Sequence, residues 1–158
     1  MAHTWLETQP AGDADNAWQT TSMSSDGSKI IAGNVFRLYL STNSGSSWSE
    51  VQPAGDANKY WYASSMSSDG SVILAGVYNS RLYLSTNSGT NWSEVQPAGD
   101  VNKIWQTSAM SSDGSVIIAG VDGGRLYLST DSGSSWSEVK PAGAADKNWR
   151  TSSMSEDG

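Results

Sequence analysis

Short apolar runs alternate with turn-forming residues along the chain, and the interval after Trp105 shows the pattern completely. The run WQTSAMS begins at Trp105, VIIAGV ends at Val121, RLYLS begins at Arg125 and WSEVKP begins at Trp136. The Asp-Gly pair between the first two runs is a strong hairpin signal. Leu126 and its neighbours alternate between two faces, as in a half-buried strand. The pattern predicts four antiparallel strands in this interval: 105–111, 116–121, 125–129 and 136–141.

Tryptophan marks the repetition of this four-strand unit. Two series recur with spacings of 43, 44 and 44 residues and contain all the tryptophans: Trp5, Trp48, Trp92 and Trp136; Trp18, Trp61, Trp105 and Trp149. A fixed period of this length is typical of a repeat architecture. One four-stranded unit cannot bury its own faces, so neighbouring units must stack. Radial stacking of such units predicts an all-β fold, a β-propeller of four-stranded antiparallel blades.

The expected array occupies residues 5–158, after a tail of residues 1–4. Trp5 is expected to open a strand of the fourth type, and WRTSSMSEDG at the end to form a strand of the first type. The array then contains about 3.5 blades, whereas propellers typically have four to eight. We therefore expect a homo-oligomer, most simply a dimer, to complete the ring. The expected units are a partial blade 5–17, complete blades 18–60, 61–104 and 105–148, and a partial blade 149–158.

The turns between the third and fourth strands carry a family resemblance. They read STNSGSSW, STNSGTNW and STDSGSSW, and they resemble the Asp-box, Ser-x-Asp-x-Gly-x-Thr-Trp, of BNR or sialidase-like propeller repeats. Two turns carry Asn where the motif has Asp, and Asn caps such a turn through its carbonyl oxygen. The tryptophans are expected to pin the fourth strand onto its own blade. The resemblance implies structural roles for Ser41, Asn43, Gly45, Trp48, Ser85, Asn87, Gly89, Trp92, Ser129, Asp131, Gly133 and Trp136.

Composition and charge argue against several classes of partner. The formal net charge is −7, and no basic stripe is present to bind phosphates, so we expect no nucleic-acid partner. No stretch approaches the roughly 18–20 consecutive apolar residues of a membrane helix, so membrane insertion is not expected. The chain has no cysteine, and its one histidine, His3, lies in the predicted tail. We therefore expect no metal site and no cofactor.

The Asp-box resemblance raises a sialidase-like glycoside hydrolase as an alternative. The catalytic constellation that this implies includes three arginines drawn from different blades, but Arg37, Arg81 and Arg125 are one repeated position on the third strand. They are expected to cover apolar surface with their stems and to keep their charged heads in solvent. Acid/base catalysis needs carboxylates with different pKa values. Here they recur as symmetric sets: Glu7, Glu50, Glu94 and Glu138; Asp26, Asp69, Asp113 and Asp157. We expect a protein that is not an enzyme.

Differences between the repeats are concentrated in two loops. These are the connection from the fourth strand to the next first strand and the loop between the second and third strands. Both are expected on one face of the disc, and loops on a rigid scaffold often carry binding residues. Aromatic faces beside Asp, Asn and Lys suit carbohydrate stacking, and a protein is the other candidate ligand. The candidates for ligand binding are Trp18, Trp61, Trp105, Trp149, Tyr60, Tyr62 and Tyr78.

Two alternatives to a ligand site stay open. The four tryptophans are also suited to packing between blades, as are methionines at one repeated position on the first strand: Met23, Met66, Met110 and Met154. The near identity of the repeats also fits an engineered or recently amplified repeat protein with purely structural self-assembly and no ligand.

Overall fold

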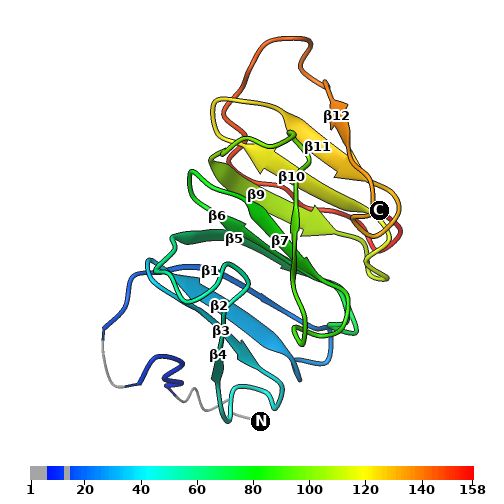
Figure 1. Ribbon diagram of the computed structural model, residues 1–158. Coiled ribbons are helices and arrows are strands. Elements are labelled where there is room, and N and C mark those ends of the chain that lie inside the picture. Colours follow the sequence, from blue (N-terminus) through cyan, green and yellow to red (C-terminus); the bar gives the residue numbers. More distant parts are fainter. Residues whose placement is uncertain (1–6, 13–14) are drawn as a thin grey trace.

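A computed structural model of the chain describes residues 7–12 and 15–158. These residues form three four-stranded sheets without helices (Figure 1). No membrane-crossing helix is therefore found in this part of the chain. Sheet 1 contains β1 (Trp18–Met23), β2 (Ile30–Asn34), β3 (Leu38–Ser41) and β4 (Ser49–Val51). Sheet 2 contains β5 (Trp61–Met66), β6 (Ile73–Val77), β7 (Leu82–Ser85) and β8 (Ser93–Val95). Sheet 3 contains β9 (Trp105–Met110), β10 (Ile117–Val121), β11 (Leu126–Ser129) and β12 (Ser137–Val139).

Each sheet is an antiparallel meander in which consecutive strands are hydrogen-bonded neighbours. In sheet 3, Gly120 is paired with both Thr107 and Leu126, so β10 lies between β9 and β11. The predicted four-strand unit is confirmed. The fourth strand is shorter than the predicted 136–141, because β12 ends at Val139 and Pro141 lacks the N–H that a longer ladder would require.

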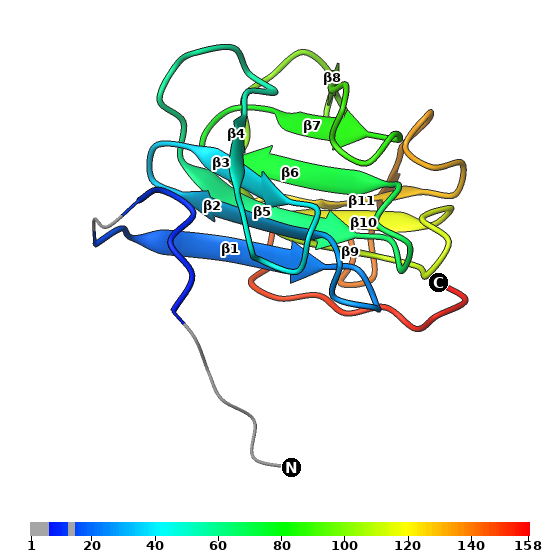
Figure 2. The same cartoon turned by 90° about the horizontal axis from the view of Figure 1, so that it is seen from below.

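The three sheets are stacked face to face, with sheet 1 nearest the viewer in Figure 2. The first strands are neighbours in this stack, with β5 between β1 and β9. The core consists of two clusters, one in each junction between sheets. In the first, sheet 1 contributes Ile31, Leu38 and Leu40, while sheet 2 contributes a set that includes Trp61 and Ile73. The stacking predicted from the repeats therefore buries one face of sheets 1 and 3 and both faces of sheet 2.

The second junction, between sheets 2 and 3, contains the same kinds of side chain as the junction between sheets 1 and 2. Leu74, Leu82 and Leu84 of sheet 2 pack with Trp105 and Ile117 of sheet 3. Each sheet thus presents a leucine-rich face to the next sheet and a tryptophan-containing face to the preceding one.

The turns that hardly vary between repeats are joined by main-chain hydrogen bonds. The amide of Ser25 donates to the carbonyl of Ser68 at 2.8 Å, and the amide of Ser68 donates to Ser112 at 2.7 Å. Within sheet 1, the amide of Ser44 donates to Ser28 at 2.9 Å. These bonds need a fixed backbone path in every copy, which explains the uniform sequence on this side of the stack.

Of the two predicted terminal strands, the final one requires correction, and the first begins outside the described residues. Trp5 lies outside the described residues, and residues 7–12 contain a turn and no strand. The final segment, 149–158, is also not a strand, although its sequence resembles β1. A strand needs a hydrogen-bonded neighbour, and the described chain contains no second strand beyond this segment for it to pair with. Figure 1 shows the segment as a red trace running beside β9.

Candidate functional site

The Asp-box-like turns form side-chain bonds that hold the third and fourth strands together. In sheet 1, Ser41 Oγ accepts a bond from the Gly45 amide at 2.9 Å and donates to Asn43 Oδ1 at 3.0 Å. Asn43 Oδ1 also accepts from the Ser47 amide at 2.8 Å. In sheet 3, Asp131 Oδ1 accepts the corresponding bonds from Ser129 Oγ and the Ser135 amide, both at 2.8 Å. Asn and Asp therefore cap the same turn.

The tryptophans of two of these turns pack beyond their own sheet, onto which they were predicted to be pinned. Trp92 and Trp136 donate through Nε1 to Gly89 and Gly133 of their own turns, at 3.0 and 3.1 Å. Their rings, however, pack against the core clusters between sheets. Trp136, for example, shares a surface cleft with Val95 of sheet 2. The rings are therefore not pinned only onto their own sheet, because the turn of one sheet faces the fourth strand of the preceding sheet.

The turns between the first and second strands hold three equivalent carboxylates. Asp69 Oδ1 accepts bonds from Ser67 Oγ at 2.7 Å and from the Ser71 amide at 2.9 Å. The Ser71 amide bond and then the Ser67 hydroxyl bond lower the pKa of Asp69 to about 2. The same network lowers the pKa values of Asp26 and Asp113 to about 2. The three aspartates are therefore equivalent turn acceptors and do not form a pair with divergent pKa values.

The repeated arginines are paired with acids, which sequence reasoning missed. Arg125 Nε lies 2.9 Å from Asp146 Oδ1 and 3.8 Å from Glu138 Oε1. Arg37 and Arg81 each pair in the same way with a glutamate of the fourth strand and an aspartate of the following loop. A signal was available, because a glutamate recurs in register with each arginine and each following loop contains an aspartate, although Asp146 lies two residues beyond the position equivalent to Asp56 and Asp100. Being partly exposed, these pairs are modest contributors to stability.

The variable loops of neighbouring sheets meet on one face, as predicted from the meander. Ser80, between β6 and β7, pairs with Lys103, which precedes β9. Tyr78 donates its amide to the carbonyl of Tyr60 at 2.8 Å. Its ring centroid lies 6.1 Å from that of Tyr60 and 5.7 Å from that of Tyr62. The structure thus brings the three predicted tyrosines together, and Tyr60 and Tyr78 are each 46% exposed.

The four tryptophans proposed beside these tyrosines are not equivalent. Trp61 and Trp105 are 3% and 2% exposed and belong to the core clusters. They are unavailable to a ligand, so the ligand hypothesis is wrong for these two, and packing between sheets explains them. Trp18 is 40% exposed, and Trp149 is half-buried. Position in the stack decides the difference, because no sheet lies before Trp18 in the described chain.

The methionines follow the same rule. Met66 and Met110 pack against the clusters between sheets, as expected for core filling. Met23 is 57% exposed, so the core prediction is wrong for this residue. Met154 is half-buried in the final segment.

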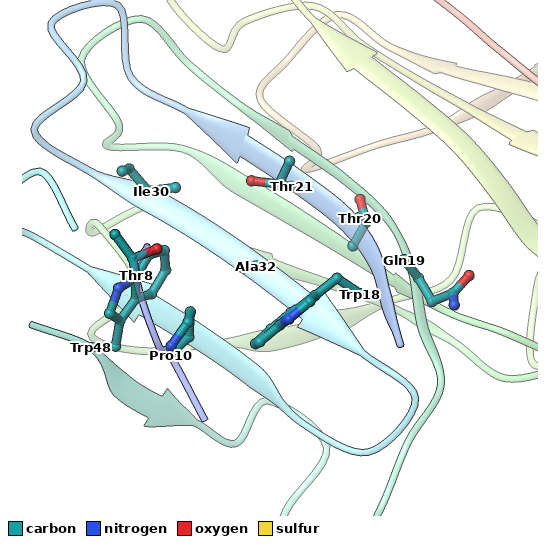
Figure 3. Close-up of a pocket in the computed structure, with 9 residues that line it drawn as sticks. All are labelled: Thr8, Pro10, Trp18, Gln19, Thr20, Thr21, Ile30, Ala32 and Trp48. Carbon is teal, nitrogen blue, oxygen red and sulfur yellow. The ribbon is translucent and has the colours of Figure 1, made fainter. Parts of the chain in front are cut away.

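The open face of sheet 1 contains a cavity of about 450 Å³. Figure 3 shows Trp18, Ile30 and Ala32 on the sheet side of this cavity, with Pro10 and Trp48 nearby. The Nε1 atom of Trp48 is buried and has no hydrogen-bond partner among the described residues. The cavity has both apolar and polar lining residues, and it corresponds to a position that is filled in the two internal junctions. No cluster of three or more potential metal-ligating His, Asp or Glu side chains occurs within residues 7–12 and 15–158.

Comparison with solved structures establishes the fold. A structure of YCF48 bound to a D1 peptide matches 87% of this chain with a TM-score of 0.65 at 16% identity. YCF48 from Cyanidioschyzon merolae matches 82% with a TM-score of 0.62, also at 16% identity. A GH74 xyloglucanase from Xanthomonas campestris matches 78% with a TM-score of 0.59 at 20% identity. These proteins and the stacked meanders share one architecture. The fold is that of a β-propeller.

The chain corresponds to only part of each similar propeller. It covers 47% of the peptide-bound YCF48 chain, 39% of the Cyanidioschyzon merolae chain and 21% of the xyloglucanase chain. No protein-family model matches the chain, and no curated protein matches its sequence. The three sheets are blades of a partial propeller, and the comparisons at this identity show the fold alone.

Proposed function

We propose that this protein is a non-catalytic propeller scaffold, of the Asp-box type, whose copies assemble into a closed ring. One observation carries the proposal. The same junction between sheets occurs twice within the chain, and the tryptophan-containing face that forms one side of it is also present on sheet 1, where no sheet covers it in the described chain. Two copies supply six sheets, which lies within the usual four to eight blades of a propeller. The equivalence of the arginine and aspartate sets supports a role without catalysis, since chemistry needs asymmetry between such groups.

Light scattering tests the assembly directly. We expect a mass near twice the monomer's 16.7 kDa at micromolar concentration, falling toward the monomer on dilution. A chain that remains monomeric at all concentrations would contradict the proposal.

We further propose that the loop face of the ring binds a glycan, with Tyr60, Tyr62 and Tyr78 as the contact residues. Two half-exposed rings in contact with a third give an aromatic surface of the kind that stacks on sugar rings. A protein segment is the second candidate ligand, since YCF48 has been solved with a bound peptide. A sialidase-like hydrolase is not favoured, because its residues would have to differ between blades.

The binding proposal is tested with a glycan array and the double variant Tyr60→Ala/Tyr78→Ala. Binding is expected for the unchanged chain and is expected to be lost in the variant. Trp61 is left unchanged, since its removal would damage the core. Thr90→Ala, in the exposed turn between β7 and β8, lies away from both the loop face and the cavity on sheet 1, so it is the surface control and is expected to bind normally. Absence of binding to glycans and to a proteome-wide peptide display would favour a purely structural repeat protein, natural or engineered.

A further inference from the structure

We infer that sheet 3 of a second copy docks into the cavity on sheet 1. In the single chain, the two terminal segments cover the surfaces that meet in this contact, and docking displaces them. This rests on the proposed self-assembly and adds to it which surfaces meet and what they displace. The segments concerned are residues 7–12, beside Trp48, and residues 147–158, beside β9.

Sheet 3 carries the leucine-rich face that fits this cavity. Ile118 and Leu128 are only half-buried. Their equivalents in sheet 2, Leu74 and Leu84, are 0% and 8% exposed because sheet 3 covers them. Sheet 3 therefore leaves two of these apolar side chains partly exposed, whereas Leu126 on the same face is buried.

The open face of sheet 1 has the matching half of the junction. Trp18 and Tyr39 form an edge contact at 5.8 Å, as do Trp61 and Tyr83 in sheet 2. Asn34 stands where sheets 2 and 3 have a valine. Its side chain is buried and bonded within sheet 1, where Oδ1 accepts from the amides of Phe36 and Arg37, both at 2.7 Å. The substitution leaves no unpaired group to oppose docking.

The final segment imitates β1 of a second copy. Ser152 Oγ lies 2.7 Å from Thr107 Oγ1, as Ser64 Oγ lies 2.7 Å from Thr20 Oγ1 in the first junction. Trp149 Nε1 donates to the carbonyl of Gly124 at 3.1 Å. Trp105 Nε1 makes the corresponding bond to Ser80 at 3.2 Å. The segment therefore occupies the place of a first strand on sheet 3, without the strand ladder that would hold β1 there.

The initial segment imitates the fourth strand of a second copy. Thr8 and Pro10 line the cavity beside Trp48, and they correspond in the repeat to Val51 and Pro53. Val51 packs against the cluster that contacts Trp92 in the first junction. Two segments cannot occupy the same position. When sheet 3 of one copy docks on sheet 1 of another, β1 therefore displaces the final segment and β12 displaces the initial segment. A complete sheet covers more apolar surface than either segment, so rising concentration shifts the balance toward the assembly.

The absence of cysteine from the chain permits a direct test with engineered disulfides. Thr21 is the equivalent of Ser64 and Ser152, so it should face Thr107 of the second copy. Under oxidation, Thr21→Cys/Thr107→Cys is expected to yield a covalent dimer that reductant returns to monomer. Thr20→Cys/Ser64→Cys is the control and is expected to close within one chain.

A second pair tests the displacement itself. Thr107→Cys/Ser152→Cys fixes the final segment on sheet 3, and its oxidation is expected to abolish the assembled species in light scattering. Reduction is expected to restore it. The oxidised Thr20→Cys/Ser64→Cys control, which fixes an internal junction, is expected to assemble like the unchanged chain.

The outcomes separate this inference from the proposed function. If the unchanged chain never assembles, both are wrong. If it assembles while Thr21→Cys/Thr107→Cys gives no intermolecular disulfide, the self-assembly stands and the junction is wrong. If oxidised Thr107→Cys/Ser152→Cys assembles normally, the final segment is not displaced and the inference is overturned.

Discussion

Replacing Trp105 with alanine is expected to lower the free energy of unfolding by about 3–5 kcal/mol, as for other buried aromatic residues. Trp105 is 2% exposed and lies in the junction between sheets 2 and 3. Its ring makes an edge contact with Tyr127 at a centroid distance of 5.7 Å, and its Nε1 donates to the carbonyl of Ser80. The substitution removes the ring, leaves a cavity between two sheets and leaves that carbonyl without its indole donor.

Trp18→Ala is the matched control, because Trp18 occupies the same position in the repeat. It makes the same edge contact, with Tyr39, but is 40% exposed. We expect a loss of about 1 kcal/mol, since less apolar surface leaves contact with the protein. Urea unfolding followed by circular dichroism measures both values, at a dilution where the chain is monomeric. Equal losses for the two variants would mean that stacking between sheets does not determine the role of this tryptophan.

Most of the fold was predictable because each repeat carries its own local signals. The Asp-Gly turn fixes the hairpin between β9 and β10, and alternation in RLYLS places Leu126 and Leu128 on one face. Stacking followed from the need of each sheet to bury its faces. These signals are local, so they predicted β5–β8 and β9–β12 equally well.

The ends of the array were not predictable from the same signals. Met23 and Met66 have nearly identical neighbours in sequence, but only Met66 lies in a junction between sheets. The segment after Trp149 resembles β1 in sequence and nevertheless lacks a partner strand in the described chain. Burial and ladder formation depend on what lies on the other side of a residue, and a local pattern does not contain that information.

The candidate binding face was predicted in part. The meander predicted that the loops around Tyr60 and Tyr78 would lie on one face, and the structure adds the main-chain bond that joins them. The pattern could not separate Trp61 from Tyr60, its neighbour in sequence. Trp61 begins β5 and is buried in the core, whereas Tyr60 still belongs to the loop and is exposed.

Glycine at position 33 permits the close approach of sheets 1 and 2, and Gly33→Ala is expected to cost about 3 kcal/mol, the upper part of the usual range for overpacking. A Cβ atom at this position would lie 2.6 Å from Cβ of Trp61. Rotation of a side chain cannot relieve a contact between two Cβ atoms, so β5 would have to move away from sheet 1. Such a movement would loosen the cluster that contains Ile31 and Leu38.

Gly120→Ala is the comparison that shows whether the neighbouring strand sets the cost of Gly33→Ala. A Cβ atom at Gly120 would lie 2.7 Å from Cγ2 of Thr107 in the same sheet and 2.9 Å from Cβ of Trp149, the equivalent of Trp61 in the repeat. Trp149 belongs to a segment without a strand ladder, which can move outward at little cost. The contact with the Thr107 methyl group then remains, so we expect a loss of about 1 kcal/mol, the lower end of the range for overpacking. Urea unfolding of both variants measures the difference. Similar losses would show that the clash is absorbed within each sheet; a large loss for Gly33→Ala alone would show that the anchored neighbouring strand sets the cost.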